Sequence, residues 1–126
     1  MSAGLEGIVQ LAIPATDIER AKRFYRDCLG LPLLFEAPNM AFFECGGVRL
    51  YVDANAGAMK PGAYTGIYFR TRDIEGTHEA LKSAGATIHE APRLIARLPD
   101  RDVWLMWVKD SETNLLGVME ERSRAP

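Results

Sequence analysis

The sequence predicts an α+β fold in which two β-α-β-β-β repeats form a concave mixed sheet with helices on its outer face. Three observations predict it. An alternating strand leads into an aspartate-capped helix in each half of the chain, a glycine ends each helix, and further strand patterns close each half. We expect a single domain over residues 1–126, with repeat one at about 7–53, a linker at about 54–62 and repeat two at about 63–120.

The first repeat begins with an alternating strand over residues 8–13, which has one apolar and one mixed face. Asp17 is a good N-cap for a helix that ends at Gly30. Phe24 and Tyr25 lie on the apolar stripe of this helix, so we expect them in the core rather than against a ligand. Further strands are expected at 31–36, 40–45 and 48–52, the last two joined by a Gly46-Gly47 turn.

The second repeat follows the same plan, because a strand at 64–71 precedes a helix that begins after Asp73 and ends at Gly85. Gln10 and Gly66 each stand seven residues before the capping aspartate, an offset of 56 residues between the repeats. The remaining elements are expected as strands at 86–90, 102–108 and 115–119, an irregular edge or loop at 92–101, and a frayed polar tail at 120–126. Since neither repeat can bury both faces of its sheet, we expect the two to lean together.

Composition excludes several classes of function. The 126 residues are 48% hydrophobic and 25% charged, with a formal net charge of −2 and a pI near 5.7, so no basic footprint for nucleic acid is present. No apolar run reaches the length of a membrane span, and the first residues do not resemble a signal peptide. We therefore expect a cytoplasmic protein without membrane contact, in which Cys28 and Cys45 are free thiols.

The ordered motifs resemble the vicinal oxygen chelate superfamily, which includes glyoxalases, bleomycin resistance proteins and extradiol dioxygenases. They are Asp17-Ile18 with Ala21, Phe24-Tyr25 and Leu29-Gly30, then Asp73-Ile74 with Gly85, and finally the closing segment from Lys109 to Leu116. That segment is similar to the family's Asp-Pro-Asp-Gly-Asn turn, but Ser111, Glu112 and Thr113 replace its Pro, Asp and Gly. The resemblance implies a homodimer that binds a small molecule.

The resemblance also implies a divalent metal held by His and Glu residues on four strands. Its first His position falls on Gln10, its second on Gly66, its last Glu on Gly117, and its remaining Glu on either Arg49 or Tyr51. Glycine offers no donor and arginine repels a cation, so we expect no metal and no cofactor. The only histidines are His78, which we place on a helix, and His89, the one candidate for a rebuilt site.

Strand alternation gives the candidate ligand-binding residues of a metal-free cleft. They are Gln10, Arg49, Tyr51, Tyr68 and Arg70, together with Trp104 or Trp107. Because the two tryptophans are three residues apart in a strand, they face opposite ways, and the sequence leaves open which one lines the cleft. Such a groove suits an aromatic or drug-like molecule, and inward-facing arginines would favour an anionic or carbonyl group. Alternatively, Arg49 and Arg70 are solvated or are paired to Glu36 or Glu44.

Three functions remain open at this point. The first is a glyoxalase- or bleomycin-resistance-like protein that binds a small molecule without metal. The second is a lyase, isomerase or dioxygenase of the same superfamily with an atypical metal site or a carboxylate general base. The carboxylates available for that role are Glu36, Glu44, Glu90, Asp100 and Asp102. The third is a structural or regulatory subunit. The sequence does not name the ligand, decide whether catalysis occurs, or say whether a dimer is domain-swapped.

Overall fold

A computed structural model describes residues 2–55 and 59–124, which fall into two compact units, Met1–Lys60 and Pro61–Pro126. The boundary between the units lies in the segment 54–62 that the sequence assigns to a linker, of which residues 56–58 are outside the described residues. Each unit carries one four-stranded mixed sheet and one main helix, as the α+β prediction requires. In the described part of the chain, no helix is long and apolar enough to cross a membrane.

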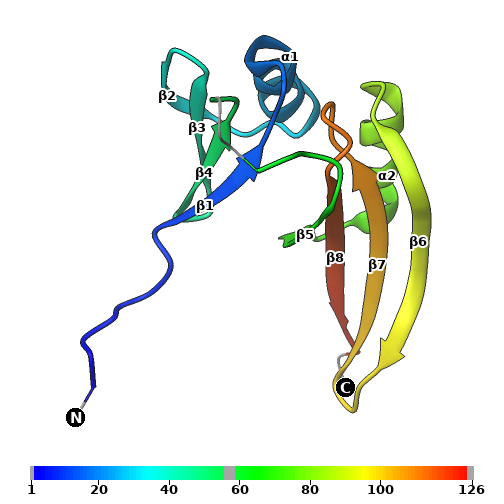
Figure 1. Ribbon diagram of the computed structural model, residues 1–126. Helices are drawn as coiled ribbons and strands as arrows, with labels where there is room; N and C mark the ends of the chain where they lie inside the picture. The colour runs from blue at the N-terminus through cyan, green and yellow to red at the C-terminus, as the bar shows by residue number, and fades with distance from the viewer. Residues whose placement is uncertain (1, 56–58, 125–126) are drawn as a thin grey trace. The chain divides into compact units, whose positions relative to one another are not determined.

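Unit 1 has the predicted β-α-β-β-β order (Figure 1). Its elements are β1 (Gln10–Pro14), α1 (Ile18–Arg23) with a π-helical continuation η1 (Phe24–Cys28), β2 (Leu33–Ala37), β3 (Met40–Cys45) and β4 (Val48–Asp53). The strand order is β1-β4-β3-β2, with β1 parallel to β4 and the other neighbours antiparallel. The Asp17 carboxylate caps α1 by accepting from the Arg20 N–H at 3.1 Å.

The core of unit 1 lies between the helix and one face of the sheet, because α1 packs on β3 and β4. Phe43, Leu50 and Val52 are buried on that face, and Tyr25 is fully buried against them from η1. Since side chains alternate along a strand, Arg49 and Tyr51 on β4 point to the opposite face. The expected core packing of Phe24 and Tyr25 is thereby confirmed.

Unit 2 repeats the arrangement (Figure 1). Its elements are β5 (Tyr64–Arg70), α2 (Ile74–Ser83), β6 (Thr87–Arg97), β7 (Arg101–Lys109) and β8 (Leu115–Ser123), in the strand order β5-β8-β7-β6 with β5 parallel to β8. Asp73 caps α2 by accepting from the Gly76 N–H at 3.1 Å. Ile74 and Leu81 of α2 are buried on the side of the sheet that carries Met106, Val108 and Leu116.

Some of the predicted strand limits differ from the observed ones. β1 begins at Gln10 rather than at residue 8, although the Val9 carbonyl still accepts from Arg49 N–H at 3.0 Å. Of the two alternatives expected for residues 92–101, the irregular edge is correct for 92–97, which belong to the edge strand β6. Register shifts in β6 let the chain bypass the missing N–H of Pro92. The supposed tail at 120–123 continues β8, since its residues pair with the start of β7.

Hydrogen bonds to Asp110 and Asn114 hold the closing turn together despite its unusual sequence. The Asp110 carboxylate accepts from the backbone N–H of Glu112 and Asn114, each at 2.8 Å, and from the Asn114 side chain at 2.8 Å. Asn114 is buried, and its carbonyl oxygen accepts from Gly62 N–H at 2.9 Å, which ties the turn to the start of unit 2. Thr113 adopts the left-handed φ of 67° that glycine usually supplies in such a turn.

Candidate functional site

A ladder of three aromatic rings lies on the helix-free face of the unit 1 sheet. Phe35 of β2 stacks on Phe42 of β3 with ring centroids 4.3 Å apart, and Phe42 stacks on Tyr51 of β4 at 4.6 Å and an interplanar angle of 8°. Phe35 is 53% exposed, so the ladder opens to solvent at β2. Burial, followed by the neighbouring Asp53, raises the pKa of the Tyr51 hydroxyl, which stays protonated at neutral pH. The face therefore offers flat apolar surface that can stack on a planar ligand.

Gln10 and Arg49 form a polar pair on the same face. They are register partners on β1 and β4, and the Arg49 Nε–H donates to Gln10 Oε1 at 2.7 Å. Of the two carboxylates considered as partners for Arg49, Glu36 lies on the helix side and binds Lys22 at 2.7 Å. Glu44 accepts from Gly47 N–H at 2.7 Å. Arg49 is half-buried and is held by a neutral amide rather than by a carboxylate.

A second aromatic cluster lies on the helix-free face of the unit 2 sheet. Trp107 of β7 packs edge-on against Tyr64 and Tyr68 of β5, with ring centroids 5.8 and 5.4 Å away. The hydroxyls of the two tyrosines are hydrogen-bonded at 3.0 Å, and this bond raises the pKa of Tyr68. Tyr64 and Tyr68 are 58% and 44% exposed, so two rings remain available for contact.

Trp104 lies on the other side of the unit 2 sheet. Its register partner on β8 is Glu120, whose carboxylate accepts from Ile74 N–H at the start of α2. The Arg122 guanidinium lies over the Trp104 ring, 5.2 Å from its centroid. The structure thus places the two tryptophans on opposite faces, with Trp107 among the tyrosines and Trp104 beside α2.

Tyr68 also covers Gly117, the position to which the resemblance assigns the last metal-binding Glu. The two residues are register partners on β5 and β8. A Cβ atom built on Gly117 would lie 2.6 Å from Tyr68 Cδ2 and 3.0 Å from Cε2, well inside van der Waals contact. The tyrosine ring therefore occupies the space into which a side chain at residue 117 would project.

The register decides which residue of β4 corresponds to Gly117. Ala12 pairs with Tyr51 in unit 1, as Tyr68 pairs with Gly117 in unit 2, and Ala12 and Tyr68 are related by the 56-residue offset of the repeats. Tyr51 is therefore the counterpart of Gly117, a choice that the sequence leaves open between Arg49 and Tyr51. In each unit a tyrosine is paired with a small residue. In unit 1 the tyrosine is on the last strand, β4, whereas in unit 2 it is on the first strand, β5.

The side chains at the four expected metal positions do not fit a divalent cation. The Gln10 oxygen is already bound by a guanidinium, and Tyr51 and Gly117 supply an aromatic ring and no side chain. Gly66 has a φ of 75° within an irregular stretch of β5, where a histidine would be strained. Among the described residues, no three His, Cys, Asp or Glu side chains gather in a group that could hold a metal ion.

The carboxylates considered as general bases all have partners of their own. Besides Glu36 and Glu44, Glu90 binds Arg93 at 2.6 Å, Asp100 binds Arg101 at 2.9 Å, and Asp102 binds Arg124. The histidines stand apart, since His89 is exposed on β6 and His78 is half-buried on α2.

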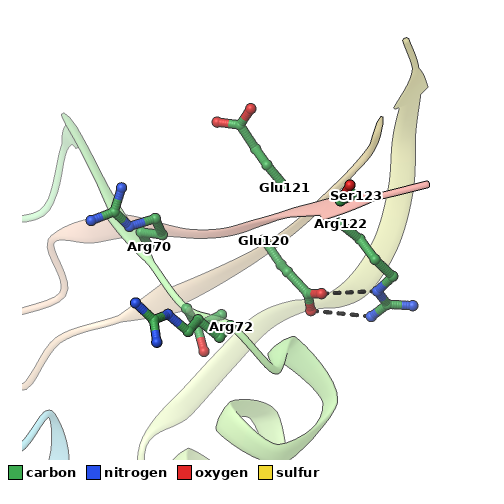
Figure 2. A pocket seen from close by; sticks show the side chains of 7 residues that line it. Arg70, Arg72, Glu120, Glu121, Arg122 and Ser123 are labelled. Carbon is green, nitrogen blue, oxygen red and sulfur yellow. Dashed lines mark hydrogen bonds and ion pairs between the residues drawn. The ribbon is translucent and has the colours of Figure 1, made fainter. Parts of the chain in front are cut away.

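A polar pocket of about 440 Å³ lies where β5 and β8 end (Figure 2). It is lined by Arg70, Thr71, Arg72, Glu120, Glu121, Arg122 and Ser123. Arg122 is shared between Glu120 and Glu75, and Glu121 binds Arg101 at 2.6 Å. Across the described residues, Arg70 and Arg72 have no hydrogen-bond or ion-pair partner, and Figure 2 shows both guanidiniums turned away from the Glu120–Arg122 pair. The charged side chains of the lining are three arginines, Arg70, Arg72 and Arg122, and two carboxylates, Glu120 and Glu121.

Reading single strands missed part of the site. Gln10, Arg49 and Tyr51 lie together in unit 1, and Tyr68 and Trp107 lie together in unit 2, with Arg70 on the same face of β5. Phe35, Phe42 and Tyr64 were not among the candidates, although they complete the two aromatic groups. Alternation along 40–45 could have placed Phe42 opposite the buried Phe43, but the bulge between Leu33 and Phe35 hides the facing of Phe35.

Comparison with known proteins gives consistent matches. The Glyoxalase/Bleomycin resistance protein/Dioxygenase superfamily matches residues 7–110. The chain is 24% identical over 115 residues to "Metallothiol transferase FosB" of Staphylococcus epidermidis; the match covers 89% of this chain but only 65% of the relative, less than two thirds of its length.

Two solved structures are similar over nearly their whole length. A member of the same superfamily from Sphaerobacter thermophilus DSM 20745 is 25% identical, with a TM-score of 0.80 and coverage of 93% of this chain and 98% of that one. TnmS3, an antibiotic binding protein from Streptomyces sp. CB03234, is 21% identical, with a TM-score of 0.76 and coverage of 95% and 99%. At this identity the second match concerns the fold alone.

Proposed function

This chain belongs to the Glyoxalase/Bleomycin resistance protein/Dioxygenase superfamily, and from that premise we propose that it binds a small, planar aromatic molecule without the help of a metal ion. The ligand stacks on the rings of one helix-free sheet face, either Phe35, Phe42 and Tyr51 of unit 1 or Tyr64, Tyr68 and Trp107 of unit 2. Gln10 and Arg49 supply the orienting polar contacts in unit 1, and Arg70 supplies one in unit 2.

One observation carries the proposal: groups that cannot bind a metal have taken over the positions of the metal ligands. An arginine holds Gln10 at 2.7 Å, and the Tyr68 ring fills the space above Gly117. Both replacements put ligand-binding surface where donor atoms are expected. The antibiotic-binding activity named for TnmS3 belongs to a protein of the same fold and is compatible with this use of the scaffold.

Metal analysis tests the first half of the proposal. We expect the purified protein to contain less than stoichiometric Mn, Fe, Ni or Zn, and we expect a chelator to leave ligand binding unchanged. FosB is named a metallothiol transferase, so a metal-dependent enzyme is the competing function. A stoichiometric metal whose removal abolishes an activity would establish that competitor and refute our proposal.

Tryptophan fluorescence tests aromatic stacking on the unit 2 face, because the two tryptophans lie on opposite faces of that sheet. A panel of naphthalene, quinoline and anthraquinone compounds should include members that quench the protein. Trp107→Phe should remove most of that response, whereas Trp104→Phe, beside α2, should keep it. If calorimetry detects no binding across the panel, the proposed function fails. Quenching that is lost only in Trp104→Phe would move the site to the helix side.

We also expect a homodimer, the assembly that the resemblance implies. Sedimentation equilibrium on the purified chain measures it directly, and a single species of 14.0 kDa would refute it.

A further inference from the structure

We propose that Arg49 is the residue that selects the ligand, and that it selects an aromatic compound bearing a carboxylate or another oxyanion. The inference rests on the proposed function and narrows the class of ligand from aromatic compounds to aromatic anions. In this proposal the guanidinium of Arg49 supplies the positive charge that a metal ion supplies in a metal-dependent relative. A guanidinium presents paired N–H donors that match the two oxygens of a carboxylate.

Arg49 is held ready for such a ligand. Its Nε–H donates to Gln10 Oε1 at 2.7 Å, which fixes the plane of the guanidinium relative to β1 and β4. In the described part of the chain, its terminal nitrogens have no hydrogen-bond or ion-pair partner, so they remain available. The partner that fixes Arg49 is neutral, and the full positive charge is therefore left for the ligand.

The two carboxylates on this face, Glu44 and Asp53, do not form an ion pair with Arg49. Glu44 is the register partner of Arg49 on β3, but its Oε2 accepts from Gly47 N–H at 2.7 Å in the hairpin turn. Asp53, two positions beyond Tyr51 on the same strand, accepts from Asn55 N–H at 2.9 Å and from its side chain. Both acids are thus turned toward their own loops.

The aromatic ladder stands on the same face as this cation. Tyr51 is two residues from Arg49 on β4, and its ring is stacked on Phe42 at 4.6 Å. Side chains two apart on a strand share one face and are about 7 Å apart along it. A fused ring lying against Tyr51 can therefore direct a carboxylate substituent toward Arg49, which combines stacking with a charge-assisted bond.

The experiment compares naphthoate with naphthamide, which differ in charge but not in ring system. Calorimetry should show naphthoate binding about tenfold more tightly than naphthamide, as expected for a hydrogen bond to a charged group on a half-buried arginine. Arg49→Met should remove this preference and leave naphthamide unchanged. Arg23→Met, which removes the same charge from the exposed surface of α1, is the matched control and should preserve it.

Two further variants keep the test independent of folding effects. Gln10→Glu should place a carboxylate on Arg49 and weaken naphthoate binding about as much as Arg49→Met does, without loss of the arginine. Glu44→Gln should leave the preference for naphthoate unchanged, because Glu44 is turned toward Gly47 and does not pair with Arg49. Thermal denaturation of each variant confirms that the fold is retained.

The outcomes separate this inference from the function beneath it. If naphthoate and naphthamide bind equally well to the wild-type protein, or if Arg49→Met weakens both alike, the role of Arg49 is refuted while the aromatic-binding function stands. If neither these two compounds nor the wider panel binds, the proposed function falls and the role of Arg49 falls with it.

Discussion

Gly117→Ala is the change whose effect should depend most clearly on a single neighbour. The new Cβ would lie 2.6, 3.0 and 3.2 Å from Cδ2, Cε2 and Cγ of Tyr68. These atoms include the base of the ring, so the tyrosine cannot yield by bending only its far end. The ring must leave Gly117, and with it the contact with Trp107 and the hydroxyl bond with Tyr64.

Two opposing effects set the change in the free energy of unfolding caused by Gly117→Ala. Enlarging a side chain in a tightly packed site costs about 1–3 kcal/mol. Replacing glycine by alanine inside a strand returns roughly 0.5–1 kcal/mol, because the unfolded chain loses less entropy on folding. We expect Gly117→Ala to lower the free energy of unfolding by about 1 kcal/mol.

The same substitution should change sign once the ring is removed. In a Tyr68→Ala background, Gly117→Ala should stabilise the protein by roughly 0.5–1 kcal/mol, since only the entropic gain remains. Urea denaturation of the four proteins in the double-mutant cycle measures the coupling, which should be about 1–3 kcal/mol. Equal destabilisation by Gly117→Ala in both backgrounds would refute the placement of Tyr68 over Gly117.

Two other predictions concern stability. Glu120 is buried and accepts from Arg122 at 2.8 Å and from Ile74 N–H at 2.9 Å, contacts that hold the pKa of Glu120 below its ordinary value of 4.5. The charged Glu120 therefore contributes to stability above pH 4.5, and this contribution is lost as the pH falls through the lower folded-state pKa. Glu120→Gln should lower the free energy of unfolding by about 1–2 kcal/mol at neutral pH and by progressively less in acid. Urea denaturation at several pH values measures this, and a cost that does not change with pH would contradict it. Thr113→Gly relieves the strain of a left-handed φ of 67°, roughly 1–2 kcal/mol, but loses the hydrogen bond that Thr113 Oγ1 donates to the Glu112 carbonyl. We expect a net stabilisation of about 0.5 kcal/mol in thermal denaturation. A clear loss of stability would show that the hydrogen bond outweighs the strain.

The local elements were largely predictable because their signals are short-range. Asp17 and Asp73 cap their helices as their sequence positions suggest, and the Gly46-Gly47 turn joins β3 to β4. The errors occur where pairing with a distant strand decides the conformation. Pro92 interrupts a sequence pattern but is accepted in an edge strand, and residues 120–123 are polar yet form β8 because β7 lies beside them.

The site divides along the same line. Residue identities alone establish that Gly66 and Gly117 bring no metal ligand and that Gln10 brings only a neutral amide. The sequence does not show which side chains occupy the space of the missing metal ligands, because the neighbours of a side chain across a sheet depend on strand register. Only the pairing of β1 with β4 joins Gln10 to Arg49, and only the pairing of β5 with β8 brings Tyr68 over Gly117.

By itself, then, the sequence determined the repeated scaffold and the loss of its usual donors, since strand alternation, helix caps and the chemistry of a side chain are local properties. The tertiary structure decided that Trp107 rather than Trp104 joins the exposed tyrosines, and that Tyr51 rather than Arg49 is the counterpart of Gly117. These outcomes follow from strand register and from bulges such as the irregular stretch around Gly66. Register is fixed by contacts between residues that are far apart in the chain.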